Sequence, residues 1–512
     1  MSHSSPRLVV VSNRLPVALS RSAGGWRVEP GAGGLVTALA PVLKDRGGKW
    51  IGWSGLAGLA EELEGLTELF ADYSSKAGYD MHPVCLSEEE VEGYYDGFAN
   101  EIAWPLFHDL QTRCNFEPAY WRAYLAVSGR FAEVVATNST PEDFVWVHDY
   151  HLVHVGAELR ARGLQRNMGF FLHIPFPPPD IFLKLPWRGE LLRALMSYDL
   201  VGFQTLRDRR NFVQSMTALG PETAISGRGA VVTARFGERR LRLGNCPISI
   251  DSVAFARTAR KPEVKRHAAE IRAALKDRWL ILGGDRLDYT KGIPQRLRAL
   301  REALRRYPDL RERVNFIQIV VPSRERVEQY SALKNEIEQL VSRINGEFTT
   351  PGWVPVHYLF TNLPREDLVA YYLAADVCLV TPLRDGMNLV AKEYCASNVT
   401  ERGVLVLSEF AGAASQLQRN GVLLVNPHDI EGMAHVINEA LRMPVDERRQ
   451  RMRRLREHVK QFNIFKWVDD FLMAAASKHL RDFPAMESVD FHRPRNVGDA
   501  ETEDGQAVRK AG

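Results

Sequence analysis

The chain has 512 residues, of which 45% are hydrophobic and 25% charged, a composition typical of a soluble globular protein that is too long for a single core. A formal net charge of only +3 gives no global support for binding nucleic acid or a membrane surface, and no apolar run reaches the ~20 residues of a membrane-spanning helix. The five cysteines are scattered without a C-x-x-C pair, which indicates neither a disulfide framework nor a zinc site and favours a reducing, cytoplasmic location.

The first half of the chain alternates apolar runs with helical segments. Near-continuous apolar runs predict strands that are covered by helices on both faces. A stretch at 119–137 is long enough for a crossover helix, and a long loop is expected at 17–30. The predicted strands lie at 7–13, 49–55, 143–149, 168–176 and 199–205.

The same rhythm begins again after residue 255. The strands predicted there lie at 278–288, 315–323, 375–382, 403–409 and 421–427. A mostly basic helical stretch follows, and the polar tail at 484–512 is expected to be disordered. The pattern predicts an α/β protein with two doubly wound, Rossmann-like domains, 1–250 and 251–462, that face each other across a cleft.

Ligands of an open parallel sheet collect beyond the carboxyl ends of its strands, so polar residues just past a strand are the candidate site residues. Gly33 and Gly34, in "GAGGLVTAL", precede a helical pattern whose backbone N–H groups can hold a diphosphate. The segment does not complete a dinucleotide-binding fingerprint, and a plain turn explains it as well. Alone, these glycines are a weak signal.

Two further candidates follow strands of the first domain. Asp149, in "VHDYH", either accepts hydrogen bonds from sugar hydroxyls or caps the helix that follows. His173, in "FLHIPFPPPD", is a satisfied core residue on its own pattern. It becomes a site candidate if its strand lies beside the strand of Asp149, as consecutive strands commonly do.

The second domain offers cations at strand ends. Arg286 and Lys291, in "GGDRLDYTKG", lie between a buried strand and a helix, and Arg324 holds an equivalent position after "IVVPS". Such cations suit a diphosphate, whose negative charge grows when it leaves. A surface ion pair is the alternative for this segment, and its position at the mouth of a sheet argues against it.

The stretch "LVTPLRDGMNLVAKEY" at 379–394 breaks a buried strand with a charged glycine turn and opens directly into a helix. Asn388 begins that helix, whose N–H groups then face the cleft. Glu393 lies about one and a half turns inside, where a carboxylate can bind the vicinal hydroxyls of a ribose. A solvated helix face would explain the charges of Lys392 and Glu393 but not the Asp385-Gly386 break.

These motifs together resemble retaining glycosyltransferases of the two-Rossmann-domain (GT-B) type, and among them the trehalose-6-phosphate synthases of family 20. The resemblance runs in order from about residue 7 to 470. The segments that carry it are "VVVSNRLPV", "GGLVTAL", "WIGWSG", "YYDGFAN", "WPLFH", "VWVHDYHL", "GFFLHIPFP", "DLVGFQT", "RLDYTKG", "PSR", "RINGEF", "TPLRDGMNLVAKEY" and "VLVLSEFAGAA".

The resemblance implies transfer of glucose from UDP-glucose, or from ADP- or GDP-glucose, to glucose 6-phosphate, giving α,α-trehalose 6-phosphate with retention of configuration. The implied acceptor-binding residues are Arg14, Tyr95, Trp104, Asp149 and Arg324. The implied donor-binding residues are Gly33, Gly34, Arg286, Lys291, Asp385, Asn388, Leu389, Val390, Ala391, Lys392 and Glu393. The implied catalytic group is Asp149, His173, Arg286, Lys291 and Asp385.

The resemblance also implies a homo-oligomer, a dimer or a tetramer, and a helix at 463–483 that crosses back to the first domain. No cofactor and no metal are expected, because the chain has no D-x-D motif and cations can replace a divalent ion at the diphosphate. The base of the donor nucleotide stays open, since all three nucleotide sugars share the ribose and diphosphate contacts.

Three other functions share part of this pattern. A glucosylglycerol-phosphate synthase would use glycerol 3-phosphate, whereas Arg14 and Tyr95 favour a hexose phosphate as acceptor. A catalytically silent homologue that senses sugar phosphates would be expected to lose donor-site residues. All four of these are present here: Arg286, Lys291, Asp385 and Glu393. A dinucleotide-dependent oxidoreductase fits the sheet pattern but lacks G-x-G-x-x-G after the first strand.

Overall fold

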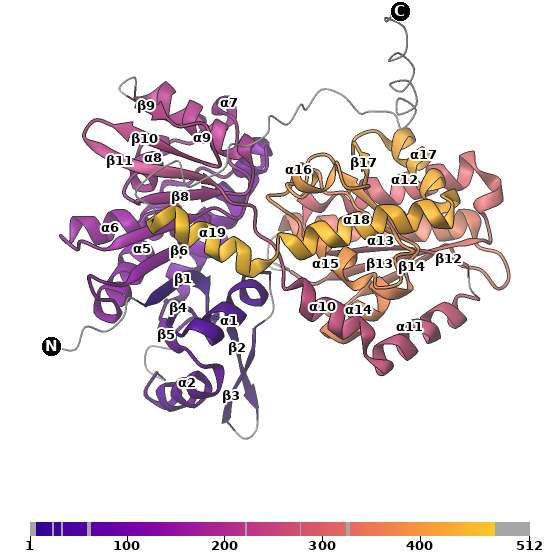
Figure 1. Ribbon diagram of the computed structural model, residues 1–512, viewed down its shortest axis with the longest axis horizontal. Helices are drawn as coiled ribbons and strands as arrows, with labels where there is room; N and C mark the ends of the chain where they lie inside the picture. The colour runs from indigo at the N-terminus through magenta and orange to yellow at the C-terminus, as the bar shows by residue number, and fades with distance from the viewer. Residues whose placement is uncertain are drawn as a thin grey trace, which may run out of the picture.

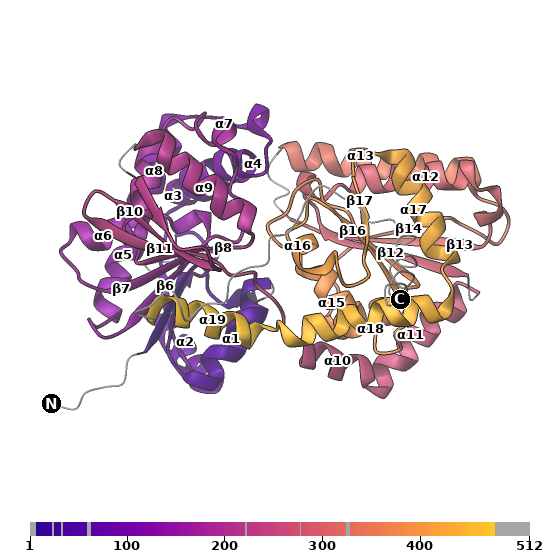
Figure 2. The same ribbon diagram turned by 45° about the horizontal axis from the view of Figure 1, so that its top comes forward.

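The computed structural model describes residues 7–22, 25–31, 34–58, 63–220, 223–276, 278–323 and 328–476. Within these ranges the chain folds into two α/β lobes that lie side by side, each with helices packed around a central sheet (Figures 1 and 2). None of the helices that it describes combines the length and apolarity needed to cross a bilayer.

The N-terminal lobe is built on a nine-stranded sheet of order β5-β4-β1-β6-β7-β8-β11-β10-β9. All neighbours from β5 to β11 are parallel, and β10 and β9 complete the sheet as antiparallel strands. The strands are β1 (Leu8–Arg14), β4 (Lys49–Trp53), β5 (Asp80–Val84), β6 (Phe144–His148), β7 (Asn167–Phe171), β8 (Leu200–Phe203), β9 (Thr223–Ser226), β10 (Val231–Phe236) and β11 (Arg239–Asn245).

The C-terminal lobe is built on a six-stranded parallel sheet of order β14-β13-β12-β15-β16-β17. The central strands are buried along most of their length, because helices cover both faces. The strands are β12 (Trp279–Arg286), β13 (Val314–Val321), β14 (Val356–Phe360), β15 (Val377–Val380), β16 (Val404–Ser408) and β17 (Leu423–Val425).

The helices alternate with the strands in both lobes. Those of the first lobe are α1 (Gly34–Arg46), α2 (Leu63–Ala77), α3 (Glu88–Glu90), the π-helix η1 (Val91–Ala103), α4 (Trp104–Phe107), η2 (Gln111–Arg113), α5 (Pro118–Asn138), η3 (Tyr150–Leu152), α6 (Val155–Ala161), α7 (Pro179–Phe182), α8 (Arg188–Leu195) and α9 (Leu206–Leu219). Those after β11 are α10 (Ser252–Arg260), α11 (Pro262–Ala274), η4 (Tyr289–Lys291), α12 (Ile293–Arg306), η5 (Pro308–Leu310), α13 (Glu328–Phe348), α14 (Arg365–Ala374), α15 (Leu389–Ser397), α16 (Ala414–Leu417), α17 (Ile430–Arg442), α18 (Val445–Gln461) and α19 (Ile464–Ala476).

Both sheets follow the doubly wound strand order. In the first lobe the order reverses between β1 and β6, and in the second it reverses between β12 and β15. At such a switch point the two flanking connections leave the sheet in opposite directions and open a crevice at the carboxyl ends of the strands. The predicted fold class, two Rossmann-like domains, is confirmed, and each domain has one predefined place for a ligand.

Residues 17–22 and 25–30 form two paired strands, so the expected long loop was wrong. Strands β2 (Val17–Ser22) and β3 (Gly25–Pro30) pair in antiparallel register. Leu19, Trp26 and Val28 pack against the apolar core beside the first sheet. The alternation of apolar and polar residues that places these side chains on one face is short, and glycines and serines lie next to it. The sequence pattern therefore looked like a loop.

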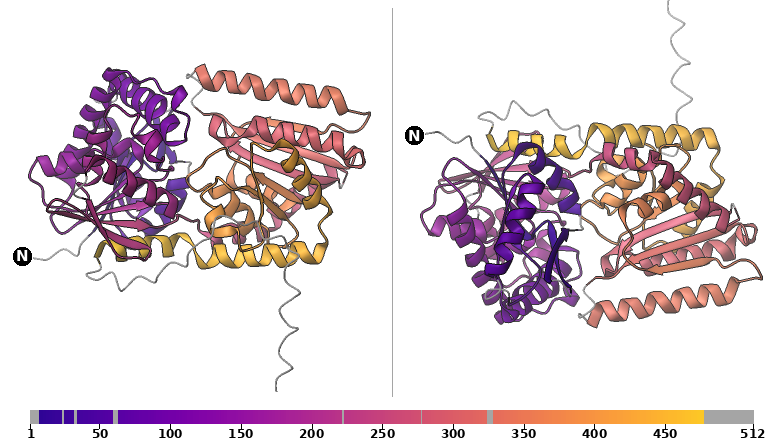
Figure 3. Two further views of the ribbon diagram at one scale, coloured as in Figure 1. Left: turned by 90° about the horizontal axis from the view of Figure 1, so that it is seen from above. Right: turned by 90° about the horizontal axis from the view of Figure 1, so that it is seen from below.

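The last two helices run along one side of the molecule, α18 on the second lobe and α19 on the first (Figure 3). The ring of Phe471 in α19 stacks on Trp146 of β6 with centroids 4.2 Å apart. A Cβ on Gly169 or Gly202 would lie 2.8 or 2.7 Å from the Phe471 ring. The absence of a side chain at these two strand positions therefore leaves the space that the ring occupies. Of the segment 463–483, residues 477–483 lie outside the described part of the chain, as does the polar tail.

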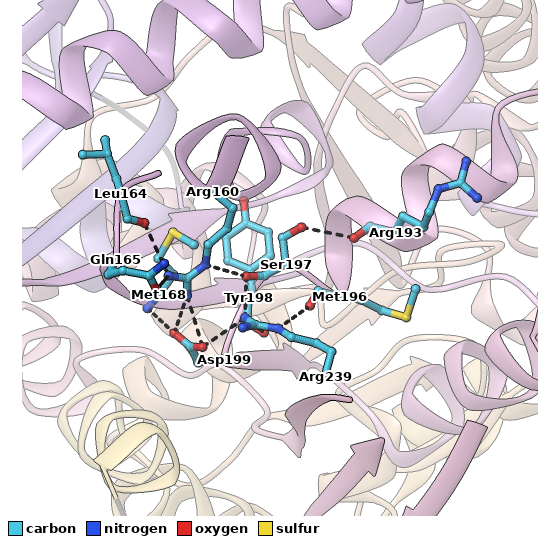
Figure 4. Close-up of polar contacts among 10 residues, drawn as sticks. All are labelled: Arg160, Leu164, Gln165, Met168, Arg193, Met196, Ser197, Tyr198, Asp199 and Arg239. Carbon is cyan, nitrogen blue, oxygen red and sulfur yellow. Dashed lines mark hydrogen bonds and ion pairs between the residues drawn. The ribbon is translucent and has the colours of Figure 1, made fainter. Parts of the chain in front are cut away.

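A polar cluster ties the elements at the amino ends of β7 and β8, the sheet edge opposite the switch point (Figure 4). The Asp199 carboxylate accepts hydrogen bonds from Arg160 at 3.1 and 3.2 Å, from Arg239 at 3.1 Å and from the Met168 backbone N–H at 2.9 Å. Arg239 also donates to the Ser197 carbonyl oxygen at 2.8 Å. The donors within this cluster have acceptors, which fits a structural function away from the ligand crevice.

Candidate active site

Arg14 is the last residue of β1, at the switch point of the first lobe. Its guanidinium carbon lies 4.1 Å from the centroid of the Trp53 ring and 5.4 Å from that of Tyr95. The ring of Tyr95 in turn stacks on His151 at 6.0 Å and an interplanar angle of 13°. The two rings hold the exposed guanidinium of Arg14 in place without neutralising it, which suits an anionic ligand.

A run of aromatic rings extends from this cation along the crevice. The Tyr150 ring lies 3.9 Å from His151 and 5.8 Å from Trp104, between centroids. The structure therefore brings Arg14, Tyr95 and the buried Trp104 into one connected cluster, although they come from three separate elements. Trp53 and His151 were not selected in the sequence analysis. Trp53 ends the strand next to β1, and this position at a strand end could have marked it as a site candidate.

Asp149 follows β6 directly and has a left-handed backbone conformation, with φ 73°. Its side chain makes no capping hydrogen bond to η3; instead Oδ1 accepts the backbone N–H of His173 at 3.2 Å. The capping interpretation is therefore not what the structure shows. A non-glycine residue in this region costs of order 1–3 kcal/mol, and such strain is typical of functional positions.

His173 lies just past β7, and β7 pairs with β6 in parallel. The strand of His173 therefore lies beside the strand that precedes Asp149, which was the condition for counting His173 as a site candidate. Its Nε2 is 3.1 Å from Nδ1 of His148, the last residue of β6. Burial lowers the pKa of His173 to about 3 and holds that of His148 well below its ordinary value. Both imidazoles are therefore neutral at physiological pH.

The first lobe is expected to lose stability as the pH falls below the ordinary histidine pKa. His173, with a pKa of about 3, and His108 and His154, each with a pKa of about 4, stay neutral in the folded state when an unfolded histidine with a pKa of 6.5 is already protonated. The unfolded state then binds more protons, so each such histidine removes about 1.4 kcal/mol per pH unit from the free energy of unfolding between pH 6.5 and its folded pKa. Urea midpoints at pH 7.5 and 5.0 measure this effect.

His173→Asn removes one of these groups and is expected to make the midpoint less dependent on pH. An unaltered pH dependence in that variant would contradict the buried neutral state of His173.

In the second lobe, Lys291 and Asp385 form an ion pair at the switch point. Lys291 Nζ lies 2.5 Å from Asp385 Oδ2, and the two side chains are only 10% and 14% exposed. Asn388 Nδ2 donates to the same carboxylate oxygen at 3.2 Å. The backbone N–H of Leu383 donates to the Thr290 carbonyl oxygen at 2.7 Å, which ties η4 to the turn before α15.

A buried ion pair supports this arrangement from behind. Arg296 Nη1 lies 2.8 Å from Asp285 Oδ2, and both side chains are almost completely buried. Arg296 also donates to Thr381 Oγ1 at 3.0 Å. Because neighbouring side chains of a strand point to opposite faces, burial of Asp285 leaves Arg286, the last residue of β12, exposed as a second cation.

The start of α15 completes the second half of the site. Asn388 is the N-cap, with φ 69°, and its side chain makes no capping bond to the first N–H groups of the helix. The residues that follow, Leu389, Val390 and Ala391, form the first turn. Tyr372 O–H donates to Glu393 Oε2 at 3.1 Å, and burial raises the pKa of Glu393.

Lys392 does not offer its side chain to this surface. Its Nζ donates to the Ile248 carbonyl oxygen and to Gln416 Oε1, each at 2.6 Å, and the residue is 1% exposed. Burial lowers its pKa to about 7. The long side chain of Lys392 thus reaches past the helix and binds the connection between the lobes. Only the backbone of Lys392 contributes to the first turns of α15.

The two halves touch. A Cβ on Gly386 would lie 2.0 Å from the carbonyl oxygen of His173, so the turn of the second lobe packs backbone to backbone on the first. Arg384 Nη1 pairs with Asp109 Oδ2 across the same interface at 2.6 Å. Gly34 is the first residue of α1, whereas Gly33 and Arg324 lie outside the described residues and their placement stays a prediction.

Facing switch points of this kind define a class of protein. One side offers cations and an uncapped helix start, which suit a nucleoside diphosphate, and the other offers a cation, aromatic rings and a carboxylate, which suit a sugar phosphate. Within the described ranges, no group of three or more His, Cys, Asp or Glu side chains is placed to hold a metal ion. The fold and site are those of a GT-B glycosyltransferase.

Comparisons with known proteins give the family. Residues 6–477 match the profile of glycosyltransferase family 20. The trehalose-6-phosphate synthase of Mycobacterium avium (strain 104) is 44% identical over 492 residues, which cover 94% of this chain and 97% of that protein. The chain belongs to glycosyltransferase family 20 and is a glycosyltransferase.

Solved structures agree in fold over nearly the whole chain. The α,α-trehalose-phosphate synthase (UDP-forming) of Burkholderia xenovorans, in complex with glucose-6-phosphate, is 35% identical, with a TM-score of 0.82 over 92% of this chain and 99% of that one. The Escherichia coli protein bound with UDP-2-fluoro glucose is 36% identical, with a TM-score of 0.81 over 92% of this chain and 99% of that one.

Proposed function

We propose that the protein transfers glucose from UDP-glucose to the 1-hydroxyl of glucose 6-phosphate and forms α,α-trehalose 6-phosphate with retention of configuration. The observation that carries this proposal is the contact of Gly386 with His173, because it joins a diphosphate-type half-site to a sugar-phosphate-type half-site. The relatives support it: the similar proteins are trehalose-6-phosphate synthases, and the two structures bind glucose-6-phosphate and a UDP-glucose analogue.

The donor half-site acts on the leaving group. Arg286 and Lys291 bind the diphosphate, whose charge rises as the bond to the sugar breaks, so their contribution is larger in the transition state than in the bound substrate. Asp385, held by Lys291 and Asn388, accepts hydrogen bonds from hydroxyls of the transferred sugar. The carboxylate of Glu393, oriented by Tyr372, accepts the ribose hydroxyls.

The acceptor half-site fixes the sugar phosphate. Arg14 pairs with the phosphate, the rings of Tyr95 and Trp104 cover the sugar, and Asp149 accepts a hydrogen bond from one of its hydroxyls. Attack then takes place on the face that the diphosphate leaves, through an oxocarbenium-like state. A phosphate oxygen of the leaving group accepts the proton of the attacking hydroxyl, so no enzymic nucleophile and no metal ion are needed.

Release of nucleoside diphosphate tests this function. UDP-, ADP- and GDP-glucose are supplied in turn with glucose 6-phosphate and EDTA, and release is expected to be fastest from UDP-glucose and absent without acceptor. Glycerol 3-phosphate replaces glucose 6-phosphate in a parallel series. Release with glycerol 3-phosphate alone would identify the other acceptor class, and no release from any donor would contradict the enzymic function.

A further inference from the structure

We propose that His148 is a positioning residue: its Nδ1–H donates to Nε2 of His173 and fixes the tautomer in which His173 presents Nδ1–H, a hydrogen-bond donor, to the transferred sugar. The part of this inference that concerns the sugar rests on the function proposed above. The part that concerns the proton rests on the contacts of the two rings.

Either ring can be the donor in the hydrogen bond between His148 and His173. The two nitrogens are 3.1 Å apart, a hydrogen-bond distance, so one of them carries hydrogen and the other a lone pair. A neutral imidazole carries one N–H. The position of the proton at this contact therefore also decides whether the other nitrogen of each ring carries hydrogen or a lone pair. If His173 donates from Nε2, the proton of His148 lies on Nε2; if His148 donates from Nδ1, the proton of His173 lies on Nδ1.

The surroundings of His148 decide between these states. Its Nε2 is buried and has no hydrogen-bond partner among the described residues. The indole N–H of Trp146 is buried without an acceptor too, and its ring centroid lies 4.7 Å from that of His148. An N–H at Nε2 would add a second orphan donor to this packed cluster, whereas a lone pair adds none, and orphaned buried N–H groups are rarer than unsatisfied acceptors.

The ring of His173 is less enclosed. His148 is fully buried, while His173 is only partly so, and within the described chain no group hydrogen-bonds to Nδ1 of His173. With Nε2 engaged by His148, Nδ1 is the atom that remains for a ligand. Proton placement at Nδ1 therefore makes His173 a donor to a sugar oxygen, whereas the opposite tautomer would make it an acceptor.

Three further contacts fix the position of this pair. Asp149 Oδ1 accepts the backbone N–H of His173, and the backbone of Gly386 packs against the His173 carbonyl, so the segment is held from both lobes. Trp467 of α19 covers the pair from a third side, with its ring centroid 6.4 Å from His148 and 6.3 Å from His173. Because His148 is fully buried, the hydrogen bond between the rings is the determinant of the tautomer.

Two substitutions of His148 separate hydrogen bonding from packing. His148→Asn places an amide N–H close to the position of Nδ1 and is expected to keep most of the activity. His148→Phe fills the same space without a donor and is expected to lower kcat about 10-fold to 100-fold, the range seen when the outer hydrogen-bond partner of a metal-bound histidine is removed. The KM of either substrate is expected to change little, because both binding half-sites remain.

His357→Phe is the matched control. His357 lies on the edge strand β14 of the other sheet and contacts Asn315, so this variant measures the effect of the same exchange away from the site. A kcat of His148→Phe equal to that of the control would overturn the positioning function of His148.

The tautomer itself is measured in the unsubstituted protein. Nitrogen-15 NMR of the histidine-labelled chain distinguishes protonated from bare ring nitrogens, and His173→Asn and His148→Asn assign the two resonance pairs. Nδ1–H with a bare Nε2 on His173 is the expected result, and Nε2–H on His173 would overturn the proposal even if His148→Phe failed to fold. This readout needs no turnover, so a failure of the proposed transfer reaction would be seen separately in the release assay.

Discussion

Replacing Lys291 with methionine is expected to lower kcat by about 10²-fold to 10³-fold, the range seen when one preorganised stabiliser of developing charge is removed. Lys291 Nζ is held 2.5 Å from Asp385 in a nearly buried setting, where water cannot take over its function. In the proposed reaction the charge that Lys291 meets grows only as the diphosphate leaves, so kcat is expected to fall more than the KM for the donor rises. Steady-state kinetics with both substrates varied measure the two effects separately.

The ion pair complicates a single substitution, since loss of Lys291 leaves the Asp385 carboxylate buried without its main partner. The double variant Lys291→Met, Asp385→Asn removes that unpaired charge and is expected to recover stability without recovering turnover. Lys76→Met is the control for loss of a lysine, because Lys76 forms an exposed helix pair with Asp72. Normal kcat in Lys291→Met would show that the leaving group is stabilised by other residues.

The strands were predictable because doubly wound sheets bury both faces of their strands. Val9, Val10 and Val11 of β1 and Leu280, Ile281 and Leu282 of β12 are all buried, and such unbroken apolar runs carry the signal. The outer strands carry less of it. β9 is mostly exposed, and β10 and β11 alternate in burial, so their sequences lack a continuous apolar run and were not identified.

The elements that bear the site were predictable for a related reason. Arg14, Asp149, Arg286 and Asp385 follow or end parallel strands, and parallel strands all finish at the same sheet edge. Sequence order therefore predicted that these residues gather beyond the carboxyl ends of the two sheets. It did not predict which atoms pair, because that depends on side-chain direction over short connections.

Lys392 shows what the sequence leaves open. It lies between Ala391 and Glu393 on α15, yet its ammonium reaches the Ile248 carbonyl oxygen of the connection between the lobes. A long flexible side chain can point several ways from one backbone position, and here a buried carbonyl and an amide oxygen decide the direction. Those acceptors are more than 20 residues away along the chain, so no local pattern could reveal them.

Gly386→Ala tests whether close approach of the two lobes is required for transfer. The added methyl group would lie 2.0 Å from the His173 carbonyl oxygen, and both partners are backbone, so no side-chain rotation relieves the contact and the turn has to move away from the first lobe. A displacement of about 1 Å between reacting groups costs roughly 10²-fold in rate, and kcat/KM is expected to fall by at least that factor. Calorimetric titration with UDP alone should give nearly unchanged affinity, because the cations of the second lobe keep their places.

Gly346→Ala in α13, where nothing lies within 4 Å of an added Cβ, is the control and should behave like the unsubstituted protein. A fully active Gly386→Ala would mean that the lobes react at a wider separation than the structure shows, and that the contact of the Gly386 turn with His173 is not needed for transfer.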